Sequence, residues 1–149
     1  MKRVAQGLLA AGLPMLPAGC LTSHGEVRPT TRLIPGDTLC VTTDSSNRFV
    51  AQDALMDSLA RRGLQTRLVP SISEGRKLPA CRYILFARTV SKWDWANYTR
   101  EIHYALYVES EKVAYVDFFG GEGYNPFKYR STAASVDACL DALFPNLIE

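Results

Sequence analysis

The pattern of apolar and polar positions predicts a single α/β domain over residues 38–149. Short runs rich in β-branched and apolar residues lie between turn-forming residues, which is typical of strands. Two longer stretches repeat apolar residues every three or four positions, which is typical of helices that cover a sheet. The predicted strands are 38–43, 64–69, 82–91, 99–109 and 112–119, and the predicted helices are 47–62 and 132–145. The order is therefore β-α-β-β-β-β-α, a mixed sheet of about five strands with two main helices packed on it.

The first predicted helix lies between two strands and makes a βαβ unit. Ser45, Ser46 and Asn47 offer N-caps, and Gly63 suits the position just past the helix end. Such crossovers are right-handed and join parallel strands, so the first two strands are expected to be parallel. The apolar stripe expected to face the sheet is Val50, Ala51, Ala54, Leu55 and Leu59.

The last two predicted strands form a hairpin around Ser110 and Glu111. If Glu109 faces Lys112, one face of the hairpin holds Ile102, Tyr104, Leu106, Val108, Val113, Tyr115 and Phe119, with Asp117 as its polar exception. The other face then holds His103, Ala105, Tyr107, Ala114, Val116 and Phe118. Apolar groups on both faces predict a sheet that is at least partly covered on each side.

A glycine-rich loop precedes the last helix, which is expected to be capped by Ser131 or Thr132 and to end near Pro145. The spacing of the loop does not match a phosphate-binding loop, and Glu122 would repel an anion. The apolar stripe of the helix is Val136, Cys139, Leu140, Leu143 and Leu147.

The first nineteen residues have the pattern of an export signal. Lys2 and Arg3 precede a mostly apolar run, which is too short to span a bilayer. Pro14 and Pro17 disfavour a stable amphipathic helix there. Ala18-Gly19-Cys20 resembles the end of a bacterial lipobox, in which cleavage precedes a lipidated cysteine, although Pro17 departs from the usual leucine. An ordinary secreted precursor is the alternative.

The lipobox resemblance implies three segments: a signal peptide at 1–19, a lipid-anchored flexible tether at 20–37, and the domain at 38–149. Turn formers and hydroxyl residues dominate the tether, and no apolar period occurs in it. Acyl chains such as palmitate on Cys20 would hold the chain in the membrane. Leu21, rather than an aspartate, after the cysteine implies the outer membrane, with the domain facing the periplasm.

Removal of the signal changes the charge and the cysteine count. Lys2 and Arg3 leave with it, so 15 basic residues remain beside 15 acidic ones, and the neutral balance gives no support to nucleic-acid binding. With Cys20 lipidated, Cys40, Cys81 and Cys139 remain. A disulfide is expected in an oxidising compartment, and three pairings stay open.

Three local patterns occur together: Cys81 two residues before Tyr83, Trp93-Asp94 with Tyr98 downstream, and Gly120–Gly123 before Lys128. The combination resembles a group of small proteobacterial lipoproteins of unassigned function, over roughly residues 38–148. The chain departs from that pattern at Trp95, Asn97, Phe127 and Tyr129. The element order is also similar to the α/β domain of CsgG and the TolB amino-terminal domain, a likeness of fold that conveys no function.

The resemblance bears on the disulfide, because that group has cysteines near positions 40 and 81. Cys40 lies in the first predicted strand and Cys81 opens the third, so a bridge would join adjacent strands or a strand and its flanking loop. Cys40–Cys81 is therefore the predicted pair.

The sequence favours a non-catalytic binding or assembly module with an envelope protein or peptidoglycan as partner. Residues 93–98 are predicted to interrupt the sheet as an aromatic connection after the strand at 82–91. The aromatic residues of this segment could stack on glycans or anchor protein interfaces, and the alternative is that they cap the core. The candidate partner-binding residues are Trp93, Asp94, Trp95, Tyr98, Tyr124 and Lys128. The second hypothesis is an envelope enzyme, a hydrolase or a thiol-dependent protein, that uses Cys139, His103 and Asp117. With His24 and His103 as the only histidines, we expect no metal or cofactor.

Overall fold

The structure is a computed structural model that describes residues 37–44, 49–94, 96–120 and 131–144. Its elements follow the predicted order: β1 (Thr38–Thr43), α1 (Phe49–Arg61), β2 (Gln65–Val69), β3 (Tyr83–Asp94), β4 (Ala96–Val108), β5 (Glu111–Phe119) and α2 (Thr132–Leu143). The predicted caps of α1 at 45–47 and the predicted Leu147 lie outside the described residues. None of the described helices is long and apolar enough to cross a bilayer.

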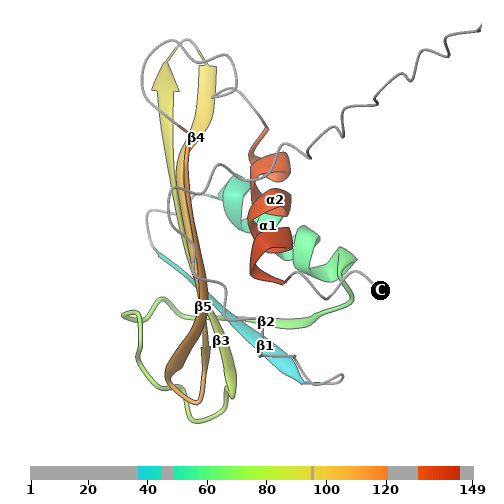
Figure 1. The fold of residues 1–149 in the computed structure, drawn as a ribbon, viewed down its shortest axis with the longest axis vertical. Coiled ribbons are helices and arrows are strands. Elements are labelled where there is room, and N and C mark those ends of the chain that lie inside the picture. The colour runs from blue at the N-terminus through green and yellow to red at the C-terminus, as the bar shows by residue number, and fades with distance from the viewer. Residues whose placement is uncertain (1–36, 45–48, 95, 121–130, 145–149) are drawn as a thin grey trace, which may run out of the picture.

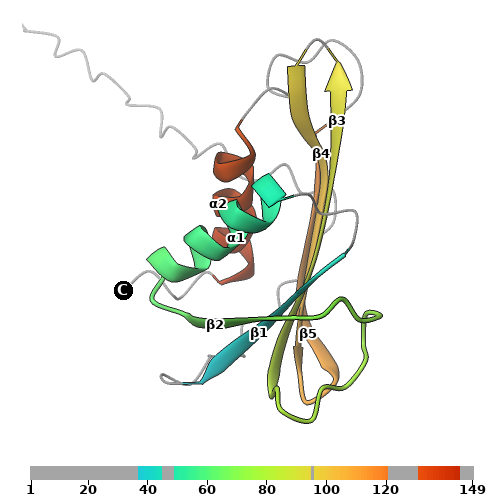
Figure 2. The same ribbon diagram turned by 180° about the vertical axis from the view of Figure 1, so that it is seen from behind.

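The five strands form one mixed sheet in the order β2-β1-β3-β4-β5. β1 pairs in parallel with both β2 and β3, while β3, β4 and β5 are antiparallel neighbours. Both helices cover the same face of this sheet, here called the helix side (Figures 1 and 2). The predicted βαβ unit and fold class are confirmed.

Local chemistry explains where the helices begin and end. α1 is followed by Gly63 at φ 73°, and the N–H groups of Gly63 and Leu64 donate to the carbonyls of Ala60 and Leu59 at 2.9 and 3.2 Å. That left-handed glycine is the predicted helix stop. At the start of α2, the Ser131 hydroxyl accepts from the Ala134 N–H at 3.2 Å, as a capping serine does.

The core has two parts, one on each face of the sheet. On the helix side, both helices pack against β1, β3, β4 and β5. The cluster includes Leu55, Leu59, Cys139 and Leu140 of the helices and Leu85, Tyr104 and Val116 of the strands. On the opposite face, a smaller cluster of Cys40, Cys81, Ile84, Phe86, Ala105 and Tyr107 packs with Ile72 and Leu78 of residues 70–81, here called the crossing segment. Coverage of both faces confirms the interpretation of the apolar pattern. The predicted helix stripe is wrong at Val50, which is 71% exposed in the first turn.

Ion pairs and hydrogen bonds join the two helices at one end. The guanidinium of Arg62, whose side chain is 11% exposed, contacts Asp137 at 3.1 Å and also pairs with Asp141. Arg61 and the Ser58 hydroxyl bond Asp137 as well. Burial opposes ionisation of Asp137, but these donors outweigh it and lower the pKa of the carboxyl. The network therefore fixes α2 against α1.

The register of the β4–β5 hairpin differs from the prediction by two residues at the turn and by one residue farther along the strands. The turn is Glu109-Ser110, both with positive φ (50° and 82°), so Tyr107 pairs with Lys112, and a register shift between Leu106 and Tyr107 then pairs Leu106 with Ala114. A one-residue slip moves every side chain of a strand to the other face. Ala114, Val116 and Phe118 therefore pack on the helix side, and Tyr115 and Asp117 share the face of His103, the reverse of the predicted arrangement.

The aromatic segment does not interrupt the sheet as the sequence suggested. β3 continues to Asp94 and β4 begins at Ala96, so Trp93 and Tyr98 lie in strands. The hairpin pairs down to Asp94 and Ala96, across a register shift at which Arg100 is the extra residue of β4. Its end projects past the helices (Figure 1). A bulge of this kind leaves the two strands paired but bent.

Candidate functional site

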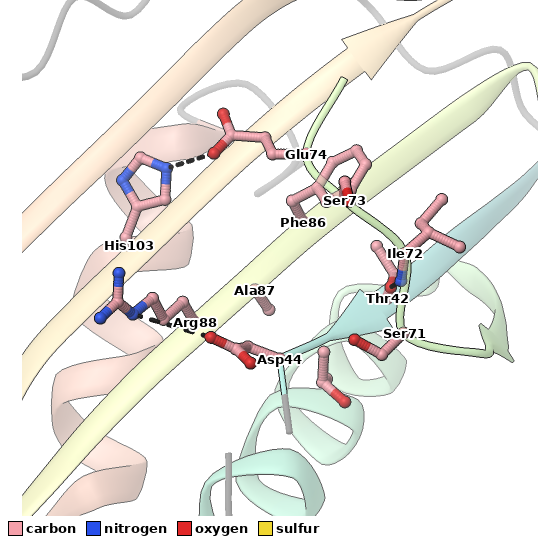
Figure 3. Close-up of a pocket in the computed structure, with 11 residues that line it drawn as sticks. Thr42, Asp44, Ser71, Ile72, Ser73, Glu74, Phe86, Ala87, Arg88 and His103 are labelled. Carbon is pink, nitrogen blue, oxygen red and sulfur yellow. Dashed lines mark hydrogen bonds and ion pairs between the residues drawn. The ribbon is translucent and has the colours of Figure 1, made fainter. Parts of the chain in front are cut away.

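A polar cavity opens on the face of the sheet opposite the helices, where β1 ends. It has a volume of about 600 Å³ and lies between the strands and the crossing segment (Figure 3). Arg88 and His103 also line a smaller adjoining cavity of about 230 Å³. The larger cavity is lined by Thr42, Thr43, Asp44, Ser71, Ile72, Ser73, Glu74, Phe86, Ala87, Arg88 and His103.

Hydrogen bonds fix the wall of this cavity to the sheet. The buried Thr42 hydroxyl donates to the Pro70 carbonyl at 3.2 Å and accepts from the Ile72 N–H at 3.3 Å. At the other end of the crossing segment, Cys81 forms a disulfide with Cys40 of β1 on the same face of the sheet. The segment is therefore tied at both ends, which positions Glu74 over β4.

His103 lies at the centre of the charged groups. It stands directly opposite Asp117 in the β4–β5 pairing, and its Nδ1 contacts the Asp117 carboxylate. Its Nε2 lies 3.5 Å from Oε2 of Glu74 (Figure 3). The carboxylate on one ring nitrogen fixes the orientation of the imidazole, and the other nitrogen is directed toward the crossing segment.

Glu74 receives two further donors from the sheet. The Tyr107 hydroxyl donates to its Oε1 at 2.8 Å, and Nζ of Lys112 lies 2.7 Å from the same oxygen. Partial burial works against ionisation, but these donors outweigh it and hold the pKa of Glu74 below its ordinary value. Burial and the Glu74 carboxylate raise the pKa of Tyr107, and the bond to Glu74 raises the pKa of Lys112. Glu74 therefore clamps the crossing segment to β4 and β5 while it is ionised.

The clamp predicts a loss of stability in acid. A carboxyl with a lowered folded-state pKa stabilises the fold above its unfolded-state pKa of about 4.5, and that contribution disappears as the pH falls through the folded-state value. Because the side chain is 40% exposed, we expect Glu74→Gln to cost only about 1 kcal/mol at pH 7. Urea unfolding at pH 7 and pH 3 measures the difference from wild type, which should shrink in acid.

Glu109→Gln is the matched control, because the Glu109 side chain is 69% exposed. Within the described residues its one ion pair is with the exposed Arg82, at 3.3 Å. Its effect should be near zero at both pH values. An equal cost of Glu74→Gln at pH 7 and pH 3 would contradict the clamp.

The structure does not bring together the three residues of the enzyme hypothesis. His103 and Asp117 are paired, but Cys139 is fully buried among the side chains between sheet and helices, on the other face. A thiol there cannot reach the imidazole. Glu74, which does reach it, was not singled out by the sequence, since nothing in a loop 33 residues from Tyr107 signals the contact.

The aromatic candidates separate into two kinds. Trp93 is 75% exposed at the end of the β3–β4 hairpin, whereas Tyr98 is 8% exposed and belongs to the buried residues. Cys20, Trp95, Tyr124, Lys128 and the side chain of Asp94 lie outside the described residues. Among the described His, Cys, Asp and Glu residues, no group of three is placed to hold a metal ion.

Comparison with known proteins finds no matching family model and no matching curated protein. Among solved structures, the chain is similar to a PelC dodecamer from Paraburkholderia phytofirmans, with 14% identity and a TM-score of 0.48 over 76% of this chain and 90% of that one. A single-substitution variant of that PelC gives 14% identity and a TM-score of 0.46, covering 73% and 92%. At this level of similarity no function transfers to this chain.

Proposed function

We propose that this chain is a lipoprotein of the bacterial envelope whose domain is a non-catalytic binding module. In this proposal, acyl chains on Cys20 anchor the protein in the outer membrane, and the tether at 20–37 separates the domain from the lipid. The domain then binds a protein or peptidoglycan partner in the periplasm. The lipobox pattern supports the anchor. The Cys40–Cys81 disulfide supports an oxidising compartment, where such bonds persist.

The observation that carries the binding role is the exposure of Trp93. Its side chain is 75% exposed, although tryptophan is among the residue types that bury most surface on average. Tryptophan is enriched among the few residues that dominate the energy of an interface. A paired hairpin end holds it on a regular element rather than on a loop, which suits a preorganised contact.

Trp93→Ala is expected to weaken partner capture tenfold or more while leaving the melting temperature near that of wild type. The loss follows from removal of an interface anchor, and the unchanged stability follows from the exposure of the side chain. Capture is measured in cells with a photo-cross-linking residue at the exposed Asn97, which pairs with Trp93.

Two controls accompany this experiment. A cross-linker at exposed Arg82, just before β3 and far along the strand from the hairpin end, should capture no partner of the hairpin end. Cys20→Ala should move the chain from the membrane to the soluble fraction, which tests the anchor separately. A large drop in melting temperature with unchanged capture in Trp93→Ala would overturn the binding role.

A further inference from the structure

Part of β3 has a strand on one side only. β1 pairs with β3 from the pair Leu39 and Tyr83 to the pair Thr43 and Ala87, where β1 ends. In the described part of the chain, β3 from Arg88 to Asp94 pairs with β4 alone. An unpaired strand edge presents a row of N–H and C=O groups that can template another strand.

The direction of these backbone groups follows from one hydrogen bond. The Asp44 N–H donates to the Ala87 carbonyl at 3.1 Å, so the backbone of Ala87 is directed to the β1 side. The peptide groups of a strand alternate sides with a period of two residues. The extra residue at the register shift is in β4, so the alternation in β3 continues. The N–H and C=O groups of Ser91 and Trp93, both exposed residues, are therefore directed to the open edge, whereas Thr89, on the same side, is buried at 2% exposure.

The side chains beside this edge are basic and apolar. Arg88, Val90 and Lys92 stand on the face opposite the helices, two residues apart. Arg88 is 60% exposed, and its Nε lies 3.8 Å from Asp44, at the limit of an ion pair. Lys92 is exposed as well. Across the strand, Glu101 is held by Arg100 at 3.3 Å. The row of alternate positions is thus basic, apolar and basic.

We propose that the partner of this domain adds to the open edge of β3 as an extended peptide with two carboxylate side chains four residues apart and an apolar residue midway between them. The peptide backbone bonds Ser91 and Trp93, and its carboxylates lie beside Arg88 and Lys92 with the apolar residue beside Val90. Strand addition gives affinity through the main chain and specificity through alternate side chains. This proposal rests on the proposed binding function and specifies the partner as an acidic peptide.

The test uses the full chain in mild detergent and a labelled seven-residue peptide with glutamate at positions 2 and 6, valine at position 4 and threonine elsewhere. Fluorescence anisotropy should show saturable binding. Ser91→Pro removes the first accessible N–H of the open edge, where proline is tolerated because the group is outside the β3–β4 ladder. We expect binding at least tenfold weaker in Ser91→Pro and unchanged in Ser91→Ala, the matched control that keeps the N–H.

The side-chain register is tested with two further peptides. A peptide with lysine in place of glutamate, and one with the glutamates moved to positions 3 and 5, should each bind at least tenfold more weakly to wild type. The double variant Arg88→Glu/Lys92→Glu should reverse the preference and bind the lysine peptide. This variant leaves the backbone edge intact, so it decides the question even if Ser91→Pro fails to fold.

Equal binding of Ser91→Pro and Ser91→Ala, equal binding of the glutamate and lysine peptides, or no peptide binding would each overturn the proposal. If Asn97 cross-linking still depends on Trp93 in that case, only the strand addition fails, and loss of that dependence overturns the binding function too. Light scattering of the protein alone adds a last outcome. Self-association that is abolished by Ser91→Pro and kept by Ser91→Ala would show that a second copy of this chain adds to the open edge of β3. That result would overturn the proposal of a peptide partner.

Discussion

Loss of the Cys40–Cys81 disulfide is expected to lower the free energy of unfolding by about 3–4 kcal/mol, because the bond closes a long loop in the unfolded chain. The cysteines are 41 residues apart, and the closed loop contains α1, β2 and the crossing segment. Cys40 is in β1 and Cys81 precedes β3, so the bond joins the parallel pair to the segment that covers it. Both sulfurs also lie within 3.4 Å of the Arg67 guanidinium.

Urea unfolding with and without reductant measures this loss, and Cys40→Ala/Cys81→Ala provides the non-redox equivalent. Cys139→Ala is the control, because Cys139 lies on the other side of the sheet and forms no disulfide. The change in unfolding free energy caused by Cys139→Ala should be the same with and without reductant. An unfolding midpoint that reductant leaves unchanged, in a chain shown by mass to be reduced, would contradict the prediction.

The predicted architecture came from patterns that act locally. Strands were recognisable as β-branched runs between turn residues, and helices as stripes such as Val136, Cys139 and Leu140, because burial on one face imposes a period on the sequence. The disulfide followed from the placement of two cysteines on neighbouring elements together with the resemblance to a group that has cysteines near both positions. These features depend on which residues are buried, and the sequence carries that information directly.

The errors arose where geometry depends on the conformation of single residues. Nothing in Glu109-Ser110 distinguishes it by composition from Ser110-Glu111 as a turn, yet two positive φ angles place the turn at Glu109 and Ser110. A register shift between Leu106 and Tyr107, which no sequence pattern marks, then sets the pairing of the rest of the hairpin. The wrong register put Asp117 on the face opposite His103, and the true one pairs them. Likewise, Trp93 in a dense aromatic run suggested a connection, but backbone pairing with β4 continues through it.

Separate sets of interactions stabilise the two faces of the sheet. Helices, with the Arg62–Asp137 contacts between them, stabilise one face. The disulfide and the Glu74 clamp hold the crossing segment on the other. Neither device involves the open edge of β3, so substitutions at Ser91 and Trp93 test binding without removing what holds the fold together.

Leu140→Ala is expected to cost about 2–5 kcal/mol of stability, because a fully buried leucine leaves both lost contacts and a cavity. Leu140→Met, which conserves volume, should cost less than about 1.5 kcal/mol. Leu140 packs on the helix side and the disulfide on the opposite face, in separate clusters. The costs of Leu140→Ala and of disulfide loss should therefore add within about 0.5 kcal/mol in denaturant unfolding. A larger coupling between the two changes in unfolding free energy would mean that the sheet transmits packing changes between its faces. The two faces would then not be stabilised separately.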